Sequence, residues 1–180
     1  WKAGLRSGDR PASSAGDGSC VFSGALKNAA SGNEGTFGVV RGLPGAGKST
    51  YAKTHFPLYR HFEADMYFVN AAGVYEFNAL QLNQAHRWCI EMVDDSIDRG
   101  RPTVVSNCFI QAWEFDPYFI IAAEYEVPVR IIELQTSHGN THGVTPEKII
   151  QMAARFNDIN IIGIEWGSVF HIQREIVPPN

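Results

Sequence analysis

The sequence predicts an α/β fold, in which a five-stranded parallel sheet carries helices on both faces. Three observations lead to this prediction. After residue 35, short apolar runs alternate with segments of helical period, which is typical of a parallel sheet covered by helices. Hydrophobic residues make up 44% and charged residues 19% of the 180 residues, which suffices for one globular core. A glycine-rich turn at residues 42–49 stands between the first predicted strand and the first predicted helix.

The composition changes near residue 35. Residues 1–35 are rich in Gly, Ser, Ala and Asp and show little periodicity, so they cannot bury much apolar surface. We therefore expect a flexible arm or linker over residues 1–35 and the α/β domain over residues 36–180. Because the chain begins with Trp1 rather than Met, we also expect it to be part of a longer polypeptide.

The first half of the domain contains two predicted strands and two predicted helices. Residues 36–42 (TFGVVRG) are a β-rich apolar run that ends in glycine, and residues 49–56 can begin a helix after it. Residues 59–65 (YRHFEAD) predict a short second strand that ends in an aspartate. Residues 77–100 have apolar side chains at helical spacing, and Gly100 is a typical stop at a helix C-terminus.

The second half continues the alternation. Its predicted strands and helices are, in order, strand 102–107, helix 114–126, strand 128–134, helix 145–156 and strand 159–166. Pro117 fits the first turn of the earlier helix. Thr145 is a typical N-cap, with Pro146 at the first position of the later helix.

The segment GLPGAGKS, residues 42–49, matches the pattern GxxxxGK[ST] in the strand-to-helix context that this pattern requires. Its glycines allow a tight loop whose backbone N–H groups surround phosphates, and the following helix adds its positive N-terminal end. Lys48 is expected to contact the β- and γ-phosphates and Ser49 to ligate Mg²⁺. No [NT]KxD guanine-reading motif follows, which favours ATP. The expected nucleotide-binding residues are Gly42, Pro44, Gly45, Ala46, Gly47, Lys48, Ser49 and Thr50.

Polar residues stand at three predicted strand ends. They are Asp65, Asn107 and Glu133. In an open parallel sheet, ligands bind beyond the carboxyl ends of the strands. Asp65 is therefore well placed to orient an acceptor hydroxyl and to take its proton during phosphoryl transfer. A surface aspartate that only caps a turn is the alternative interpretation.

Several motifs occur in an order that resembles a known family. RGLPGAGKSTYA, EADMYF, GVYEFNALQLNQAHRWC, EYEVPVRIIEL and NTHGVTPEKIIQMAARF resemble the P-loop kinase domains related to polynucleotide 5′-kinase. They look most similar to the Nedd-binding-protein-like AAA/kinase subgroup, with the cyclic-nucleotide phosphodiesterase kinase-like domain as a more distant relative. The resemblance implies a nucleoside-kinase-type strand order and an acceptor such as a polynucleotide 5′-hydroxyl. It also implies that Lys48 and Ser49 are the phosphate and metal residues and that Asp65 is the general base.

Two positions depart from this family pattern. The family typically has an aspartate at the end of the third strand, where this chain has Asn107. The family also has arginines in a lid after the fourth strand, whereas QTSHGNTHGV, residues 135–144, contains neither Arg nor Lys. Arg155 on the following helix is a candidate replacement, as are His138 and His142 when protonated. A simple helix-face charge is the other interpretation of Arg155.

Two clusters allow more than one interpretation. The aromatic residues after Asp65 fit either a stacking platform for a nucleobase or packing beneath a loop. They are Tyr67, Phe68, Tyr75 and Phe77, with His86 and Trp88 on the next predicted helix. Four basic residues near the loop could form a positive rim or a solvated face, namely Arg41, Lys53, Arg60 and His61.

Three functions remain open from the sequence. The first is an ATP- and Mg²⁺-dependent kinase domain acting on a nucleotide or a single-stranded RNA or DNA 5′-end. The second is a nucleotide-binding scaffold module that transfers nothing, and the third is a small-molecule kinase. The net charge of −4 argues against a broadly basic nucleic-acid coat. The three cysteines lack metal spacing, and there is no membrane-length apolar run, so we expect a cytoplasmic protein without membrane contacts.

Overall fold

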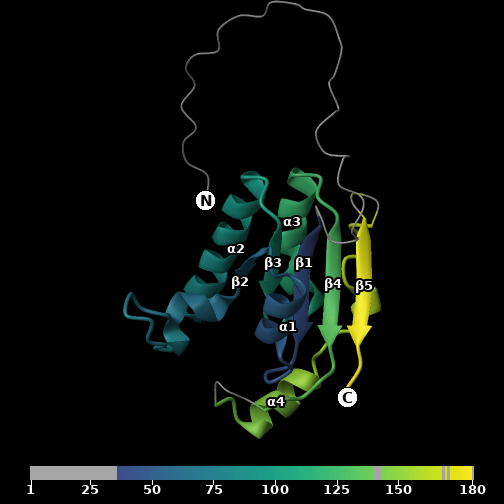
Figure 1. Cartoon of the computed structure of the whole chain (residues 1–180). Helices are drawn as coiled ribbons and strands as arrows, with labels where there is room; N and C mark the ends of the chain where they lie inside the picture. Colours follow the sequence, from purple (N-terminus) through teal and green to yellow (C-terminus); the bar gives the residue numbers. More distant parts are fainter. Residues whose placement is uncertain (1–35, 140–142, 168, 170, 180) are drawn as a thin grey trace, which may run out of the picture. The chain divides into compact units, whose positions relative to one another are not determined.

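A computed structural model of the protein describes residues 36–139, 143–167, 169 and 171–179 (Figure 1). The predicted arm, residues 1–35, lies outside the described residues. None of the helices in the described part of the chain combines the length and the apolar character that a membrane crossing needs.

The domain is built around a sheet of five parallel strands in the order β2-β3-β1-β4-β5 (Figure 1). The strands are β1 (Phe37–Gly42), β2 (Arg60–Phe62), β3 (Thr103–Ser106), β4 (Val129–Leu134) and β5 (Ile172–Val177). β1 lies at the centre, where Val39 pairs in register with Val105 of β3 and Ile131 of β4. The predicted α/β fold with a five-stranded parallel sheet is therefore confirmed.

Helices cover both faces of the sheet. They are α1 (Lys48–His55), α2 (Leu82–Asp98), α3 (Asp116–Glu124) and α4 (Pro146–Ala153). Short 3₁₀ turns connect them, namely η1 (Ala64–Phe68), η2 (Ala79–Gln81), η3 (Ala112–Phe115) and η4 (Ile159–Ile161). Figure 1 shows α4 at the end of the sheet toward which the strand arrows point. The carboxyl ends of the strands, which together form the carboxyl edge of the sheet, therefore face α4.

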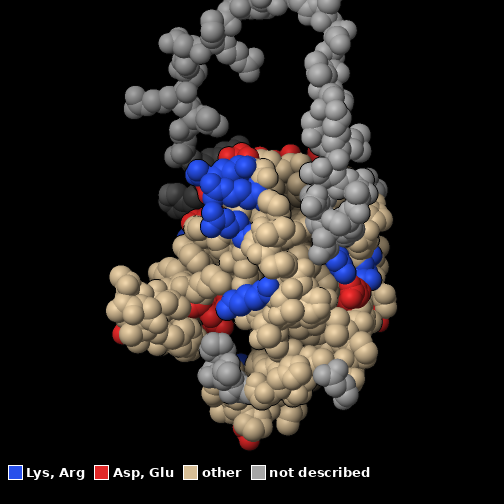
Figure 2. All heavy atoms as spheres, viewed as in Figure 1, with Lys and Arg blue, Asp and Glu red and all other residues tan. Residues whose placement is uncertain are grey.

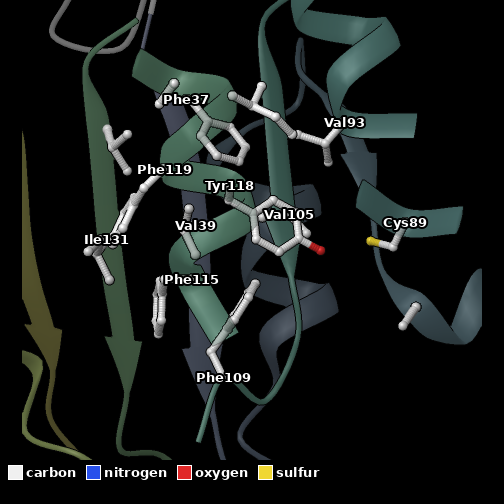
Figure 3. Close-up of a cluster of buried hydrophobic side chains, with 14 of the residues drawn as sticks. Phe37, Val39, Cys89, Val93, Val105, Phe109, Phe115, Tyr118, Phe119 and Ile131 are labelled. Carbon is white, nitrogen blue, oxygen red and sulfur yellow. The ribbon is translucent and has the colours of Figure 1, made fainter. Parts of the chain in front are cut away.

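Side chains alternate between two cores along the central strand, as the two-residue period of a strand requires. Val39 belongs to the larger cluster, which α2 and α3 cover and to which Phe115 and Tyr118 contribute (Figure 3). Val40 belongs to the smaller cluster on the opposite face, where it packs with Ala52 of α1. Near-continuous apolar runs such as VV and II are what strands buried on both faces need.

The local helix signals act as predicted. Gly100 adopts a φ of 65° just after the end of α2, in the left-handed region that favours glycine. The Thr145 hydroxyl accepts a hydrogen bond from the backbone N–H of Lys148 at 3.3 Å, and so caps α4. Pro117 lies in the first turn of α3.

The fifth strand is not where the sequence predicted it. Residues 159–166 form η4 and the turns after it, whereas β5 comes later, at Ile172–Val177. Ile159 and Ile162 are buried with a spacing of three residues, which suits a 3₁₀ turn packed on the core. Gly163 has a φ of 68°, and a Cβ there would lie 2.8 Å from Phe119 Cε2. The apolar run is thus a buried turn, and the prediction of a strand there was wrong.

Candidate functional site

The glycine-rich loop connects the carboxyl end of β1 to the start of α1 at the carboxyl edge of the sheet (Figure 1). A Cβ at Gly42 would lie only 2.8 Å from the backbone oxygen of Leu134, so β4 leaves no room for a side chain there. Gly47 has a φ of 82° as the N-cap of α1, which again favours glycine. The loop closes through a hydrogen bond from the Ala46 N–H to the Leu43 oxygen at 3.1 Å. Its shape is that of a phosphate-binding loop.

Lys48 and Ser49, the first residues of α1, both have defined partners. Lys48 Nζ donates a hydrogen bond to the backbone oxygen of Leu43 at 3.0 Å, so its ammonium lies over the loop. Ser49 Oγ donates to Glu63 Oε2 at 2.5 Å. Thr50 is exposed on the outer side of the first helical turn. The two residues predicted to bind phosphate and metal thus lie at the mouth of the loop.

The segment after β4 supports this loop. Thr136 Oγ1 donates to the Ala46 oxygen at 2.7 Å, and the His138 N–H donates to the Gly45 oxygen at 2.8 Å. The His138 ring lies against Gly47, since a Cβ at Gly47 would approach its Cδ2 to 3.0 Å. Of the two histidines predicted as replacements for a lid arginine, His138 is at the loop, and His142 lies outside the described residues.

Glu63 is a site residue that the sequence interpretation missed. β2 ends at Phe62, so Glu63 rather than Asp65 follows the carboxyl end of the strand. Glu63 Oε2 accepts hydrogen bonds from Ser49 Oγ and, at 3.1 Å, from Ser106 Oγ at the end of β3. The only sequence signal for Glu63 was its place within EADMYF, directly after a short apolar strand.

His61 completes this polar network. Its Nε2 lies 2.7 Å from Ser106 Oγ and 3.8 Å from Glu63 Oε2. Because the Ser106 proton goes to Glu63, the geometry assigns the N–H of His61 to Nε2. Burial lowers the pKa of His61, although the Glu63 charge opposes this shift. His61 is thus a hydrogen-bond donor to Ser106.

Asp65 lies in the first turn of η1 instead of at a strand end, which corrects its predicted position. Its Oδ1 accepts a hydrogen bond from the Tyr75 hydroxyl at 3.3 Å. Burial, followed by the charge of Asp65 and this hydrogen bond, raises the pKa of Tyr75 to about 12. Burial also raises the pKa of the Cys108 thiol, with the charge of Lys48 opposing the shift and that of Asp65 adding to it.

Asn107 fixes the backbone between the two carboxylates. Its Oδ1 accepts from the Ala64 N–H at 2.9 Å, and its Nδ2 is 3.7 Å from Cys89 Sγ as a donor. Ala64 stands between Glu63 and Asp65, so this one side chain positions both. An aspartate could not supply the donor. The residue that departs from the family pattern is thus an anchor for the site.

We expect Asn107→Ala to lower the free energy of unfolding by about 1–3 kcal/mol, because a buried backbone N–H loses its acceptor. Urea unfolding measures this loss, and hydrogen exchange at the Ala64 amide should become faster. Asn83, exposed on α2, is the control, since Asn83→Ala removes the same group without a buried partner. Equal stability of the two variants would contradict the anchoring role of Asn107.

Glu133, the third predicted strand-end residue, is buried and does not line the mouth of the loop. Its Oε2 forms an ion pair with Arg41 Nη1 at 3.2 Å, and Arg41 is 0% exposed. Burial lowers the pKa of Arg41 to about 10, with the charges of Glu133, Glu114 and Asp158 opposing the shift. Both interpretations of Arg41 from the sequence, a positive rim and a solvated face, are therefore wrong.

The other basic residues do not form one surface either. Lys53 is exposed on α1, whereas Arg60 begins β2 at the end of the strand away from the loop. On the face shown in Figure 2, the Lys and Arg side chains stand in small separate groups. Arg155 is exposed in the turn after α4, not on the helix as predicted, and its Nε donates to the Gln151 oxygen at 3.3 Å. No continuous positive surface is visible on this face.

The aromatic cluster after Asp65 has a buried centre and an exposed outer part. Phe68 is buried, and the rings of Tyr67, Tyr75 and Phe77 lie around it with centroid distances of 5.1–6.2 Å. Phe77 remains 55% exposed and Tyr75 38% exposed. The inner rings are packing residues, while the outer two present aromatic surface to solvent beside Asp65.

The donor set at the loop fits a nucleotide with Mg²⁺. The loop offers a glycine-lined cradle with one ammonium, and one hydroxyl hydrogen-bonded to a carboxylate stands beside it. Among the described residues, no group of three or more His, Cys, Asp or Glu could hold a metal ion. Mg²⁺ does not need such a group, because it binds through one or two protein oxygens together with water and phosphate.

Comparison with known proteins agrees with this geometry. The model of the AAA domain family AAA_33 matches residues 38–142, more than half of the chain, and the chain belongs to this family. NEDD4-binding protein 2 of Homo sapiens is 31% identical over 132 residues, which are 66% of this chain and 7% of that protein. The chain thus spans less than a tenth of the length of this relative.

Solved structures support the fold alone. A sugar kinase from Janibacter superposes with a TM-score of 0.53 at 15% identity, covering 79% of this chain and 84% of that one. A protein from Chloroflexus aurantiacus also gives a TM-score of 0.53, at 11% identity, over 79% of this chain and 88% of that one. The P-loop kinase-like fold predicted from the sequence is confirmed.

Proposed function

We propose that this chain, as a member of the AAA domain family AAA_33, is an ATP- and Mg²⁺-binding kinase domain. In this proposal it transfers the terminal phosphate of ATP to a hydroxyl of a polynucleotide or nucleotide. The observation that carries the proposal is the hydrogen bond at 2.5 Å from Ser49 Oγ, beside Lys48 at the start of α1, to Glu63, which stands two residues before Asp65. The loop that would hold the phosphates and the segment that carries the candidate general base are thus joined by a hydrogen bond.

The loop residues have the role of holding the nucleotide. Backbone N–H groups of the loop, to which Pro44 contributes none, would surround the phosphates together with the N-terminus of α1, and Lys48 would exchange the Leu43 oxygen for phosphate oxygens. Ser49 Oγ supplies an oxygen ligand to the cation. When bound with ATP, Mg²⁺ would neutralise charge on the phosphates and orient them.

Asp65 is the proposed general base. As the acceptor oxygen bonds to the γ-phosphorus and the bond to the β–γ bridging oxygen breaks, Asp65 takes the proton of the acceptor hydroxyl, and ADP leaves. The Tyr75 hydroxyl, which donates to Asp65 Oδ1, holds this carboxylate at the mouth. Arg155 is the proposed source of positive charge for the phosphate in flight. Because it is exposed beyond α4, it acts only if this segment closes over the nucleotide.

The outer aromatic rings favour an acceptor that carries a base. Tyr75 and Phe77 present exposed rings next to Asp65, and every nucleobase has a π-face that can stack on such a ring. A hydroxyl at the end of an unpaired strand could therefore reach Asp65 while its base lies on this surface.

A second candidate function is a nucleotide-binding scaffold that transfers nothing. Asn107 favours it, because both ends of its amide are engaged in holding Ala64 and Cys89. The absence of Arg and Lys from residues 135–144 points the same way. A small-molecule kinase is the third candidate, since the acceptor surface differs among enzymes of one fold.

The test is transfer of label from terminally labelled ATP with Mg²⁺ to a 5′-hydroxyl RNA or DNA oligonucleotide. We expect labelled product, and a fall of about 10²–10⁴-fold in the transfer rate for Asp65→Asn. Asp98→Asn, on the exposed end of α2, is the matched control and should transfer at the native rate. ATP binding without label on the oligonucleotide would contradict the proposal and support the scaffold, whereas label on a small alcohol alone would support the small-molecule kinase.

A further inference from the structure

We infer that Glu63 is the carboxylate that orients the Ser49 hydroxyl and thereby anchors the Mg²⁺–nucleotide complex in this chain. The inference rests on the nucleotide-binding part of the proposed function, and it is independent of phosphate transfer. It assigns to the end of β2 a charge that the family pattern would place at the end of β3, where this chain has Asn107.

The first support is the direction of the Ser49 proton. A hydroxyl oxygen that gives a lone pair to a cation cannot point its proton at that cation, so the proton needs another acceptor. Ser49 Oγ donates this proton to Glu63 Oε2 at 2.5 Å. The hydroxyl lone pairs are thus left for a cation at the mouth of the loop. Outer partners of this kind fix the orientation of a metal ligand and raise its basicity.

The second support is that Glu63 is itself held in place. Ser106 Oγ donates to the same oxygen at 3.1 Å, and His61 Nε2 in turn contacts Ser106 Oγ at 2.7 Å. The next residue along the chain, Ala64, is held through its N–H by Asn107. The Glu63 side chain keeps 19% exposure, so water bound to a cation can still reach its carboxylate. The carboxylate is fixed before any ligand arrives, and it remains open on one side.

The third support is that the other polar side chains predicted at this edge interact with other partners. Asn107 is neutral, and its oxygen is taken by the Ala64 N–H. Asp65 interacts with the Tyr75 hydroxyl on the side of the exposed aromatic rings. Glu133 is buried against Arg41. Among the described residues, Glu63 is the carboxylate that accepts the hydrogen bond of the Ser49 hydroxyl.

The test measures metal binding directly. Mn²⁺ can replace Mg²⁺ in such sites, and its EPR signal reports the free ion. In the full chain with ADP bound, we expect Glu63→Gln to weaken Mn²⁺ binding about 10- to 100-fold, the usual effect of removing an outer partner of a metal ligand. ADP affinity in EDTA should stay within about twofold of native, because the loop and Lys48 are unchanged. Glu63→Asp keeps the charge and should recover part of the Mn²⁺ affinity.

Glu91→Gln makes the same chemical change on the exposed face of α2 and should bind Mn²⁺ as the native chain does. Native-like Mn²⁺ affinity in Glu63→Gln, with an unchanged melting temperature, would overturn the inference. Equal losses of ADP affinity with and without metal would also overturn it, since they would point to a damaged loop. A native chain that binds Mn²⁺ and ADP through Glu63 but labels no acceptor would contradict the proposed kinase function and support the assignment of Glu63.

Discussion

Lys48→Ala is expected to lose measurable ATP binding at concentrations that saturate the native chain. The Lys48 ammonium lies over the loop, where it now donates to the Leu43 oxygen at 3.0 Å, and phosphate oxygens would replace this partner. Hydrogen bonds to charged groups contribute about 1.5–3 kcal/mol each, so one ammonium that bridges two phosphates is expected to account for about 100-fold or more in affinity. Isothermal titration with ATP and Mg²⁺ measures this loss.

The same variant should also transfer phosphate far more slowly. Removing a positive charge from the transferred phosphoryl group costs about 10³–10⁵-fold in rate where an arginine supplies that charge, and Lys48 is expected to act in this range. Lys53→Ala is the matched control, because Lys53 is an exposed lysine on the same helix. ATP affinity of Lys48→Ala equal to that of Lys53→Ala would contradict the assignment of the loop as the nucleotide site.

Arg41→Met is expected to lower the free energy of unfolding by about 3–5 kcal/mol, the usual cost of breaking a buried ion pair from one side. Arg41 is 0% exposed and pairs with Glu133 at 3.2 Å. Its Nη1 donates to the Asn157 oxygen at 3.0 Å, and its guanidinium carbon lies 3.8 Å from the centroid of the Phe156 ring. The variant would leave the buried Glu133 carboxylate without its ion-pair partner. It would also remove the contacts that Arg41 makes with Phe156 and Asn157 after α4. Urea unfolding of the full chain measures the effect.

A second substitution and a matched control separate the ion pair from simple loss of volume. Adding Glu133→Leu should restore most of the lost stability, because a buried ion pair replaced by apolar side chains is often neutral or stabilising. Arg130→Met is the control, since Arg130 forms a partly exposed ion pair with Glu175 at 2.6 Å. Such exposed pairs contribute about 0–1 kcal/mol. Equal losses for Arg41→Met and Arg130→Met would contradict the proposed importance of the buried pair.

The candidate site divides into a part that was predictable and a part that was not. The loop of residues 42–49 was predictable, because its chemistry lies in consecutive residues whose backbone forms the cradle. The role of Glu63 was not, because its partner Ser49 is 14 positions away and Ser106 is 43 positions away. β2 is only three residues long, so the sequence could not tell which of Glu63 and Asp65 follows the strand. The buried position of Arg41 was not predictable either, because a charged residue is expected at the surface.

By itself, the amino-acid sequence determined the alternation of strands and helices and the phosphate-binding loop. It also determined the end of α2 before Gly100 and the start of α4 after Thr145. These features depend on neighbouring residues, whose periodicity and backbone preferences act locally. The tertiary structure alone decided the place of the fifth strand. The run at 159–166 is apolar because Ile159 and Ile162 pack into the core, whereas β5 lies at the edge of the sheet and keeps polar side chains. Packing partners decide between a buried turn and a strand, and they come from distant parts of the chain.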